Sequence, residues 1–367
     1  MQNFRQGWGG APESVRLMAN FLMPRGVDSD VFDSGFICTD VGKLGALPEI
    51  GSRLPQFKLE STQSYDAILI TGPWQKPLGL RRVLAARGQK QPMYYLPRGG
   101  LARIDFELRK SVRKKAYFLA VERRFLDASD GVIFSSAAER AETIATARGR
   151  RPEHVIPDFV TPPRQEMRND NRKQGRVTFG FLAEIAPRKG LIQLVEAFVD
   201  WSRGSHLQDH VRLIVGGAPR PGSEGYLEEI NAILRKNHSA NVELRGPVSH
   251  TQRDQFYRET DVIVVPSLFE SYGLTVIEAI AFGCALLVAP KVGILEFIPA
   301  HESLTILRST DVADIKAGLN QVYLAAIQPD CARRRMSFEY GNMIAEAINS
   351  RALSAWSTLL GIDDSSV

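Results

Sequence analysis

The sequence predicts an α/β protein made of two doubly wound domains, each built around a parallel sheet. Short apolar runs alternate with amphipathic helical stretches along the whole chain, and 367 residues are enough for two domains. Segment 161–175 is polar, contains two prolines and shows no periodicity. We therefore place domains at 1–162 and 176–345 with a linker at 163–175. Because ligands of such folds bind beyond the carboxyl ends of the strands, we expect the two domains to face a central cleft.

The expected elements of the first domain are short apolar strands bounded by turn residues, at 67–70, 93–96 and 131–134. A helix is predicted after Pro12, with apolar residues at i, i+3, i+4 and i+7 from Val15. A doubly wound domain normally opens with a strand that leads into its first glycine-rich loop. Here only six residues, beginning Met1-Gln2-Asn3-Phe4, precede Gly7-Trp8-Gly9-Gly10, so either that first strand is missing or the chain starts late.

The second domain repeats the alternation. An apolar helix face is expected from Leu191 to Phe198, and Gly283 is expected to end a helix that begins near Leu274. The expected strands lie at 177–182, 211–215, 241–244, 262–265 and 285–288.

Composition and charge exclude several classes. With 44% hydrophobic and 24% charged residues the chain is an ordinary globular protein, and no run approaches the roughly 18 apolar residues of a membrane span. The absence of an apolar leader and the three widely spaced cysteines predict a cytoplasmic protein with reduced thiols. No Cys or His lies at ligand spacing, so no metal site is expected. Residues 1–160 carry a net charge of +7 and residues 161–367 carry −2, which again suggests two domains.

The most informative stretch runs from Asp261 to Gly283. It predicts a strand, a loop containing Glu270, and a helix that begins after Gly273 and carries Glu278 in its second turn. The N–H groups and the dipole at the start of such a helix suit a phosphate or diphosphate. On spacing alone, the more ordinary explanation of the two carboxylates is a loop glutamate and a solvated helix glutamate without a shared ligand.

Glu270 through Gly283 resembles the E-x7-E signature of retaining glycosyltransferases with the GT-B fold, specifically family 4 (glycosyl transferases group 1). GT-B enzymes have two Rossmann-like domains, and in them the last helix crosses back to the first domain, which we assign to 346–367. Five more segments resemble family motifs in the family's order: Gly9-Gly10 before a helix, Pro97-Arg98-Gly99, Ser135 to Glu139, Val155 to Val160, and Lys189-Gly190 with the apolar helix that ends Glu196-Ala197-Phe198.

The resemblance implies roles for individual residues. Lys189 and Glu270 would be catalytic, Lys189 by binding the donor diphosphate and Glu270 by contacting the transferred sugar. Glu278 would hold the ribose hydroxyls. The remaining residues assigned to the donor are Gly273, Leu274, Thr275, Gly9, Gly10 and Arg188, and those assigned to the acceptor side are Arg98 and Gly99. The nucleotide-diphospho-sugar would be a substrate, so no cofactor and no metal are expected.

Three departures from the family pattern stand out. Ala183-Glu184 replaces a Gly-Arg pair, so the charge at position 184 is reversed. Arg98 stands where the family usually has His, and we expect it to supply the cation lost at 184. Pro157-Asp158-Phe159 lacks the usual Asn-Gly and is interpreted as a tolerated hinge variant.

Segment 109–124 combines basic and apolar residues at helical spacing. One interpretation is a solvated helix face; the other is an amphipathic helix that holds the protein on anionic lipid at the inner face of the membrane. Nucleic acid is not an expected partner, because no aromatic platform or RNA motif accompanies the charge.

The sequence therefore predicts a retaining glycosyltransferase that moves a sugar from a nucleotide-diphospho-sugar to a glycan or lipid-linked acceptor, in cell-surface polysaccharide biosynthesis. The alternative is a catalytically inactive relative that acts as a binding or scaffold subunit.

Overall fold

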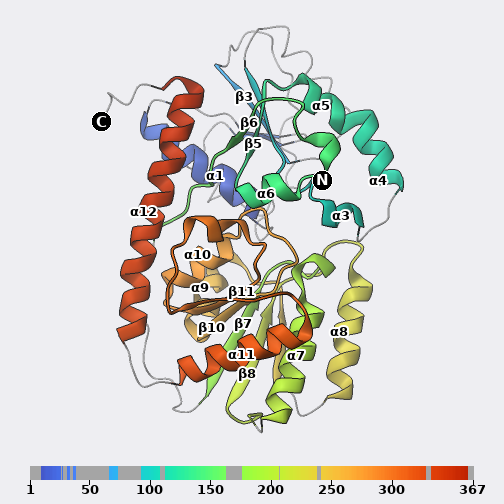
Figure 1. Ribbon diagram of the computed structural model, residues 1–367, viewed down its shortest axis with the longest axis vertical. Helices are drawn as coiled ribbons and strands as arrows, with labels where there is room; N and C mark the ends of the chain where they lie inside the picture. The colour runs from blue at the N-terminus through green and yellow to red at the C-terminus, as the bar shows by residue number, and fades with distance from the viewer. Residues whose placement is uncertain are drawn as a thin grey trace. The chain divides into compact units, whose positions relative to one another are not determined.

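The computed structural model describes residues 10–25, 27, 31–33, 36–38, 66–72, 92–107, 112–162, 176–205, 207–237, 241–327 and 332–362. The chain divides into two compact units (Figure 1). Unit 1 comprises Met1–Val160 and Ile348–Val367, and unit 2 comprises Thr161–Ala347. The expected first strand of the N-terminal domain lies outside the described residues.

Unit 1 contains a four-stranded parallel sheet in the order β3-β4-β5-β6. A separate antiparallel pair, β1 and β2, precedes it. The strands are β1 (Val31–Asp33), β2 (Phe36–Cys38), β3 (Ile68–Thr71), β4 (Met93–Leu96), β5 (Gly131–Phe134) and β6 (Glu153–Val155). The predicted strands at 93–96 and 131–134 are confirmed, and the one at 67–70 is confirmed with a shift of one residue.

Helices cover both faces of this sheet, which is why its strands are nearly continuous apolar runs. The helical segments are α1 (Gly10–Leu22), η1 (Met23–Arg25), α3 (Arg103–Glu107), α4 (Val112–Tyr117), η4 (Phe118–Glu122), α5 (Arg123–Ala128), α6 (Ala137–Glu142) and η5 (Ala145–Ala147). Val132 and Phe134 pack in one buried cluster with Phe125, whereas Ile133 between them packs in the other with Leu22. This alternation follows from the two-residue period of a strand.

The second cluster of unit 1 includes the end of α12 (Ala332–Leu360), the red helix in Figure 1. Trp356 is buried there against α1, as the sequence predicts for a core residue. Asn349 fastens the helix to the end of the first chain segment, because its side chain accepts the N–H of Val160 and donates to the Val160 carbonyl, both at 2.9 Å.

Unit 2 contains a six-stranded parallel sheet in the order β12-β11-β10-β7-β8-β9. Its strands are β7 (Val177–Leu182), β8 (Val211–Gly216), β9 (Val242–Gly246), β10 (Val262–Val265), β11 (Ala285–Val288) and β12 (Leu304–Ile306). All five strands predicted for this region are present. The edge strand β12 was not predicted.

The helical segments of unit 2 are η6 (Pro187–Lys189), α7 (Leu191–Gly204), α8 (Glu224–Lys236), α9 (His250–Glu259), α10 (Leu274–Ala281), η7 (Gly293–Phe297) and α11 (Val312–Ala326). The predicted apolar face of α7 is buried, and Phe198 and Trp201 on it meet Phe179 of β7 edge-on. The core of unit 2 therefore fixes β7 and the segment that follows it.

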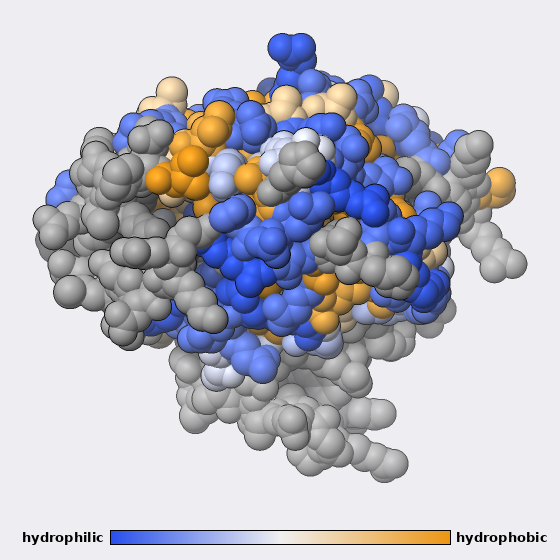
Figure 2. Space-filling model, turned by 90° about the horizontal axis from the view of Figure 1, so that it is seen from below, coloured by the Kyte–Doolittle hydropathy of each residue, from blue (hydrophilic) through white to orange (hydrophobic). Residues whose placement is uncertain are grey.

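The fold class predicted from the sequence, an α/β protein with parallel sheets in two Rossmann-like halves, is confirmed. The cleft between the halves stays a prediction. Within the described part of the chain, no helix is long and apolar enough to span a membrane. The face shown in Figure 2 is mostly hydrophilic, with hydrophobic residues in separate small areas, as is normal for protein surfaces.

Candidate active site

The predicted loop between β10 and α10 is present, and Gly273 is its critical position. Its φ of 107° lies in the left-handed region, and a Cβ there would lie 2.6 Å from the side chain of Val292. This backbone turn lets α10 begin at Leu274, as predicted, although the helix ends at Ala281 rather than Gly283. The first N–H groups of α10, at Leu274 and Thr275, have no carbonyl of their own helix to bond.

Lys189 and Glu270, 81 residues apart, form an ion pair in the loops that follow β7 and β10. Gly190 lets these two loops approach, because a Cβ there would lie 2.1 Å from the carbonyl oxygen of Pro266. The N–H of Leu268 donates to the carbonyl of Arg188 at 2.9 Å and joins the two loops directly. Both charged side chains are mostly buried, with exposed fractions of 13% and 14%.

Glu270 is held as a carboxylate. Burial opposes its ionisation, but the charges of Lys189 and Arg188, together with hydrogen bonds from Lys189 and Ser267, outweigh that effect and lower its pKa. Burial lowers the pKa of Lys189, and Arg188 adds to this, while Glu270 and Glu184 raise it. The Ser267 hydroxyl donates to Glu270 at 2.7 Å. The result is a buried, charged pair whose members fix one another.

Glu278 belongs to a second cluster, with two residues of α9 that sequence reasoning missed. The Arg253 guanidinium donates to its Oε1 at 2.7 Å, and the Tyr257 hydroxyl donates to its Oε2 at 2.6 Å. Arg253 and Tyr257 are four residues apart, so they share a face of α9. That spacing, together with the Ser249 and Gln252 capping box that starts the helix, is the signal that could have found them.

Glu184, the reversed charge, lies just after the end of β7 and faces Arg220. The Arg220 Nε is 4.0 Å from a Glu184 oxygen. Backbone hydrogen bonds hold the two segments together, from Ile185 to the Ala218 carbonyl at 2.8 Å and from Arg220 to the Ile185 carbonyl at 3.0 Å. Both side chains are about one-third exposed. Glu184 also acts on Lys189 by raising its pKa.

In unit 1, Arg98 is paired with Asp158 in an ion pair whose members are each 9% exposed. Two departures from the family pattern thus compensate each other, since the arginine at 98 meets the aspartate at 158. The expectation that Arg98 supplies the cation lost at position 184 stays a prediction, and the structure adds that Arg98 has a counter-charge within its own unit. Gly99 donates its N–H to the buried carboxylate of Glu139, which also accepts from the backbone and hydroxyl of Ser135.

The remaining assigned residues are only partly described. Gly10 is the first residue of α1, and Gly9 lies outside the described residues. Among the described residues, no group of three or more His, Cys, Asp or Glu side chains could hold a metal ion.

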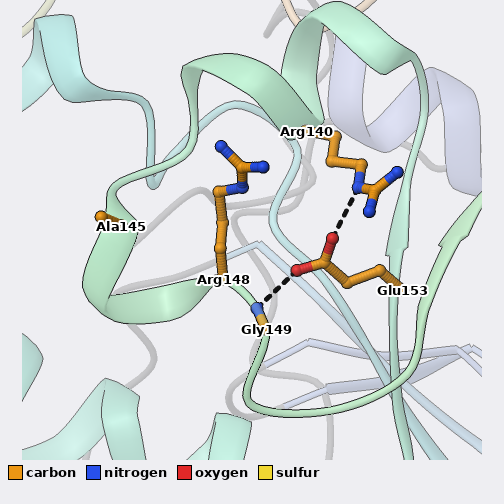
Figure 3. Close-up of a pocket in the computed structure, with 5 residues that line it drawn as sticks. All are labelled: Arg140, Ala145, Arg148, Gly149 and Glu153. Atoms are coloured by element: carbon orange, nitrogen blue, oxygen red, sulfur yellow. Dashed lines mark hydrogen bonds and ion pairs between the residues drawn. The ribbon is translucent and has the colours of Figure 1, made fainter.

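A surface pocket in unit 1 is lined by Arg140, Ala145, Arg148, Gly149 and Glu153 (Figure 3). The Glu153 carboxylate accepts from Arg140 at 2.5 Å and from the Gly149 N–H at 2.6 Å. This carboxylate occupies the position that an anion would need between the arginines, so the pocket is no candidate active site.

Residues 163–336 match the family model described as Glycosyl transferases group 1. Among curated relatives, lipopolysaccharide 1,2-N-acetylglucosaminetransferase of Salmonella typhimurium is 30% identical over 122 residues, covering 32% of this chain and 31% of that protein. D-inositol 3-phosphate glycosyltransferase of Gordonia bronchialis is 28% identical over 222 residues, covering 57% and 47%. The chain thus spans less than half the length of these relatives.

Solved structures share the fold over most of the chain. Sucrose-phosphate synthase from Thermosynechococcus elongatus aligns with a TM-score of 0.62 and 19% identity, covering 82% of this chain and 75% of that one. Anabaena HepE, solved with UDP and glucose, aligns with a TM-score of 0.62 and 17% identity, covering 81% and 78%. The Lys189–Glu270 pair and Glu278 all fall inside the segment matched by the family model. The chain therefore has the GT-B fold of these glycosyltransferase structures, and its residues 163–336 are similar to the Glycosyl transferases group 1 family.

Proposed function

We propose that this protein is a retaining, metal-independent family 4 glycosyltransferase that moves a sugar from a nucleotide-diphospho-sugar to a glycan or lipid-linked acceptor. The observation that carries the proposal is the buried Lys189–Glu270 pair beside the start of α10, inside the matched domain. A buried ion pair costs desolvation free energy and contributes little to stability by itself, which favours a role beyond folding. The Lys189–Glu270 pair therefore supports an enzyme rather than a scaffold subunit. We place the reaction in cell-surface polysaccharide biosynthesis.

In the proposed reaction the donor diphosphate lies at the N-terminus of α10, where the N–H groups of Leu274 and Thr275 face it. Lys189 has three N–H donors, so it can bind a phosphate oxygen while it keeps its contact with Glu270. As the bond between the sugar and the diphosphate breaks, negative charge grows on the leaving phosphate, and the ammonium stabilises that charge. Arg188, next in sequence, adds positive charge to the same loop.

Glu270 then has two tasks. It holds the Lys189 ammonium in place, and its remaining lone pairs accept hydrogen bonds from hydroxyl groups of the transferred sugar. The acceptor hydroxyl attacks from the face that the leaving group departs from and gives its proton to the leaving phosphate, so the anomeric configuration is retained. Glu278 accepts the ribose hydroxyls of the nucleotide. The donor contacts of Gly9 and Gly10 and the acceptor contacts of Arg98 and Gly99, which the family resemblance implies, stay predictions.

The donor base is proposed from relatives of the same fold. HepE was solved with UDP, and so was TarM of S. aureus, which shares a TM-score of 0.59 with this chain. We expect UDP and UDP-sugars to raise the thermal unfolding midpoint more than GDP, ADP or their sugars, because a ligand that binds only the folded state stabilises it by mass action. The shift should disappear in Lys189→Met and persist in the surface variant Lys316→Met. A flat panel would favour the scaffold subunit instead.

We also propose that the segment from α4 to α5 binds anionic lipid at the inner face of the membrane. Val112 and Leu119 are 79% and 56% exposed, and Lys115, Arg123 and Arg124 beside them are exposed as well. Apolar side chains among basic ones suit the boundary of an anionic bilayer. Liposome flotation tests this: binding should require anionic lipid and fall in Leu119→Asp but not in Leu324→Asp, a matched exposed leucine of α11. Equal flotation with neutral vesicles would contradict it.

A further inference from the structure

Two side chains of a single helix donate hydrogen bonds to the carboxylate of Glu278. Its Oε1 accepts from Arg253 at 2.7 Å and its Oε2 accepts from Tyr257 at 2.6 Å. The two donors lie one turn apart on α9, while Glu278 lies on α10. Each carboxylate oxygen thus has its own donor, and together the two contacts fix both the position and the plane of the group.

Tyr257 is the buried one of these two donors and is held in place by packing. Its side chain is fully buried, and its ring stacks on Phe282 with centroids 5.3 Å apart and an angle of 19° between the planes. Phe282 follows α10 directly, so the same ring contact joins α9 to the end of the helix that carries Glu278. Burial raises the pKa of Tyr257 far above its ordinary value, and the Glu278 charge adds to this, so the phenol keeps its proton and always donates.

Arg253 is the partly exposed donor to Glu278. Its side chain is 28% exposed and that of Glu278 is 26% exposed, so one side of the carboxylate remains open to a ligand. An ionised carboxylate has about four lone-pair positions. Arg253 and Tyr257 use two of them, and one position on each oxygen is left. Two neighbouring acceptors held in one plane match two neighbouring hydroxyl groups on a five-membered sugar ring.

We infer that Arg253 and Tyr257 are positioning residues that orient Glu278 to accept both hydroxyls of the donor ribose. The inference rests on the proposed function, in which Glu278 contacts the ribose, and it extends that function to two residues of α9. A free glutamate side chain would lose rotamer freedom on binding, so holding it in advance improves affinity for the diol. Neither residue needs to touch the nucleotide for this effect.

Calorimetric titration with UDP and with 2′,3′-dideoxy-UDP tests the inference, because the second compound lacks the diol. The full-length protein should bind UDP at least about tenfold more tightly, since hydroxyls on a charged acceptor form strong hydrogen bonds. In Tyr257→Phe this preference should fall to about threefold or less, with the dideoxy compound bound as before. Tyr323→Phe removes a phenol hydroxyl elsewhere in unit 2 and should keep the full preference.

Arg253→Gln is the second variant, and it keeps the inference testable if Tyr257→Phe does not fold. It should lower the preference for the diol in the same way, whereas Arg258→Gln, a change on the same helix, should not. Suppose that the unaltered protein prefers UDP to the dideoxy compound and that Tyr257→Phe and Arg253→Gln show the same preference. The positioning role is then wrong, and Glu278 binds the ribose without help from α9. If the unaltered protein binds UDP without discriminating, the ribose assignment itself fails and the inference fails with it.

Discussion

Each unit holds a glutamate beyond the carboxyl end of a central strand, and the pKa values of these two glutamates are shifted in opposite directions. In unit 1, Glu139 follows β5 and accepts only from neutral donors, the N–H groups of Gly99 and Ser135 and the Ser135 hydroxyl. In unit 2, Glu270 follows β10 and meets the ammonium of Lys189. Burial raises the pKa of Glu139 more than its hydrogen bonds lower it, whereas cations lower the pKa of Glu270. The partner, not the burial, decides the direction of the pKa shift.

This difference distinguishes a glutamate that stabilises the fold from one that can act on a ligand. Glu139 of α6 accepts a hydrogen bond from the N–H of Gly99 and has only 1% of its surface exposed. Its role is therefore to hold the backbone of the Gly99 loop against α6. Glu270 keeps a charge and a small exposed fraction, which are the properties needed to act on a ligand. Four predictions test the contrast, in order of decreasing expected effect.

The largest effect is expected for Lys189→Met. It leaves Glu270 buried without its main cation and removes the charge proposed to stabilise the leaving phosphate. The rate of sugar transfer should fall on the order of 10²–10³-fold, which is typical when one such stabilising group is lost. The matched control is Lys316→Met, which breaks an exposed pair with Asp200 in the same unit. A transfer rate within threefold of the unaltered protein would remove Lys189 from the mechanism.

Asp158→Asn should have the next largest effect, and it should act on stability. It leaves the buried guanidinium of Arg98 without a counter-charge, and breaking a buried ion pair in this way costs about 3 kcal/mol. Calorimetry should show a lower unfolding temperature for unit 1. Glu142→Gln, which breaks a partly exposed contact to Arg103, should change the free energy of unfolding by less than about 1 kcal/mol. Equal effects of the two changes would mean that the Arg98–Asp158 pair contributes nothing special.

The pH dependence of stability should have opposite signs at the two glutamates. The folded-state pKa of Glu139 is raised, so its contribution is complete below the ordinary carboxyl pKa and is lost as pH rises through the raised value. The folded-state pKa of Glu270 is lowered, so its contribution is complete above the ordinary value and is lost as pH falls through the lowered one.

Urea unfolding of the protein and of its Glu139→Gln and Glu270→Gln variants, from neutral to acidic pH, measures this. As the solution becomes more acidic, the stability advantage over Glu139→Gln should grow and the advantage over Glu270→Gln should shrink. Two trends of the same sign would show that the partners do not set the charges as described.

The smallest effect is expected for Glu184→Gln, which removes a partly exposed carboxylate that acts on Lys189. UDP affinity should rise about twofold to threefold at low salt and return to the original value at high salt, because exposed charges interact weakly and are screened. Glu243→Gln, an exposed change on β9, is the control. Weaker binding by Glu184→Gln would mean that Glu184 supports the donor site rather than opposing it.

Sequence reasoning reached most of the fold and part of the site. The buried central strands and the start of α10 were predicted because their apolar runs and glycines are local signals. The edge strands β6 and β12 were missed because each is only three residues long and not fully buried. Arg253 and Tyr257 were missed because their spacing places them on one face of α9 but does not show that this face meets Glu278. The contact between Glu184 and Arg220 could not be predicted either, because it joins two separate loops.

The sequence by itself determined the alternation of strands and helices, the left-handed turns at Gly190 and Gly273, and the identity of the charged residues. These depend on side-chain period and on backbone freedom, which are properties of neighbours in the chain. Only the tertiary structure decided which charges meet: Lys189 with Glu270 across 81 positions, and Arg98 with Asp158 across 60. Ion pairs form between groups that packing brings within a few ångströms, and packing is set by the whole core rather than by any local pattern.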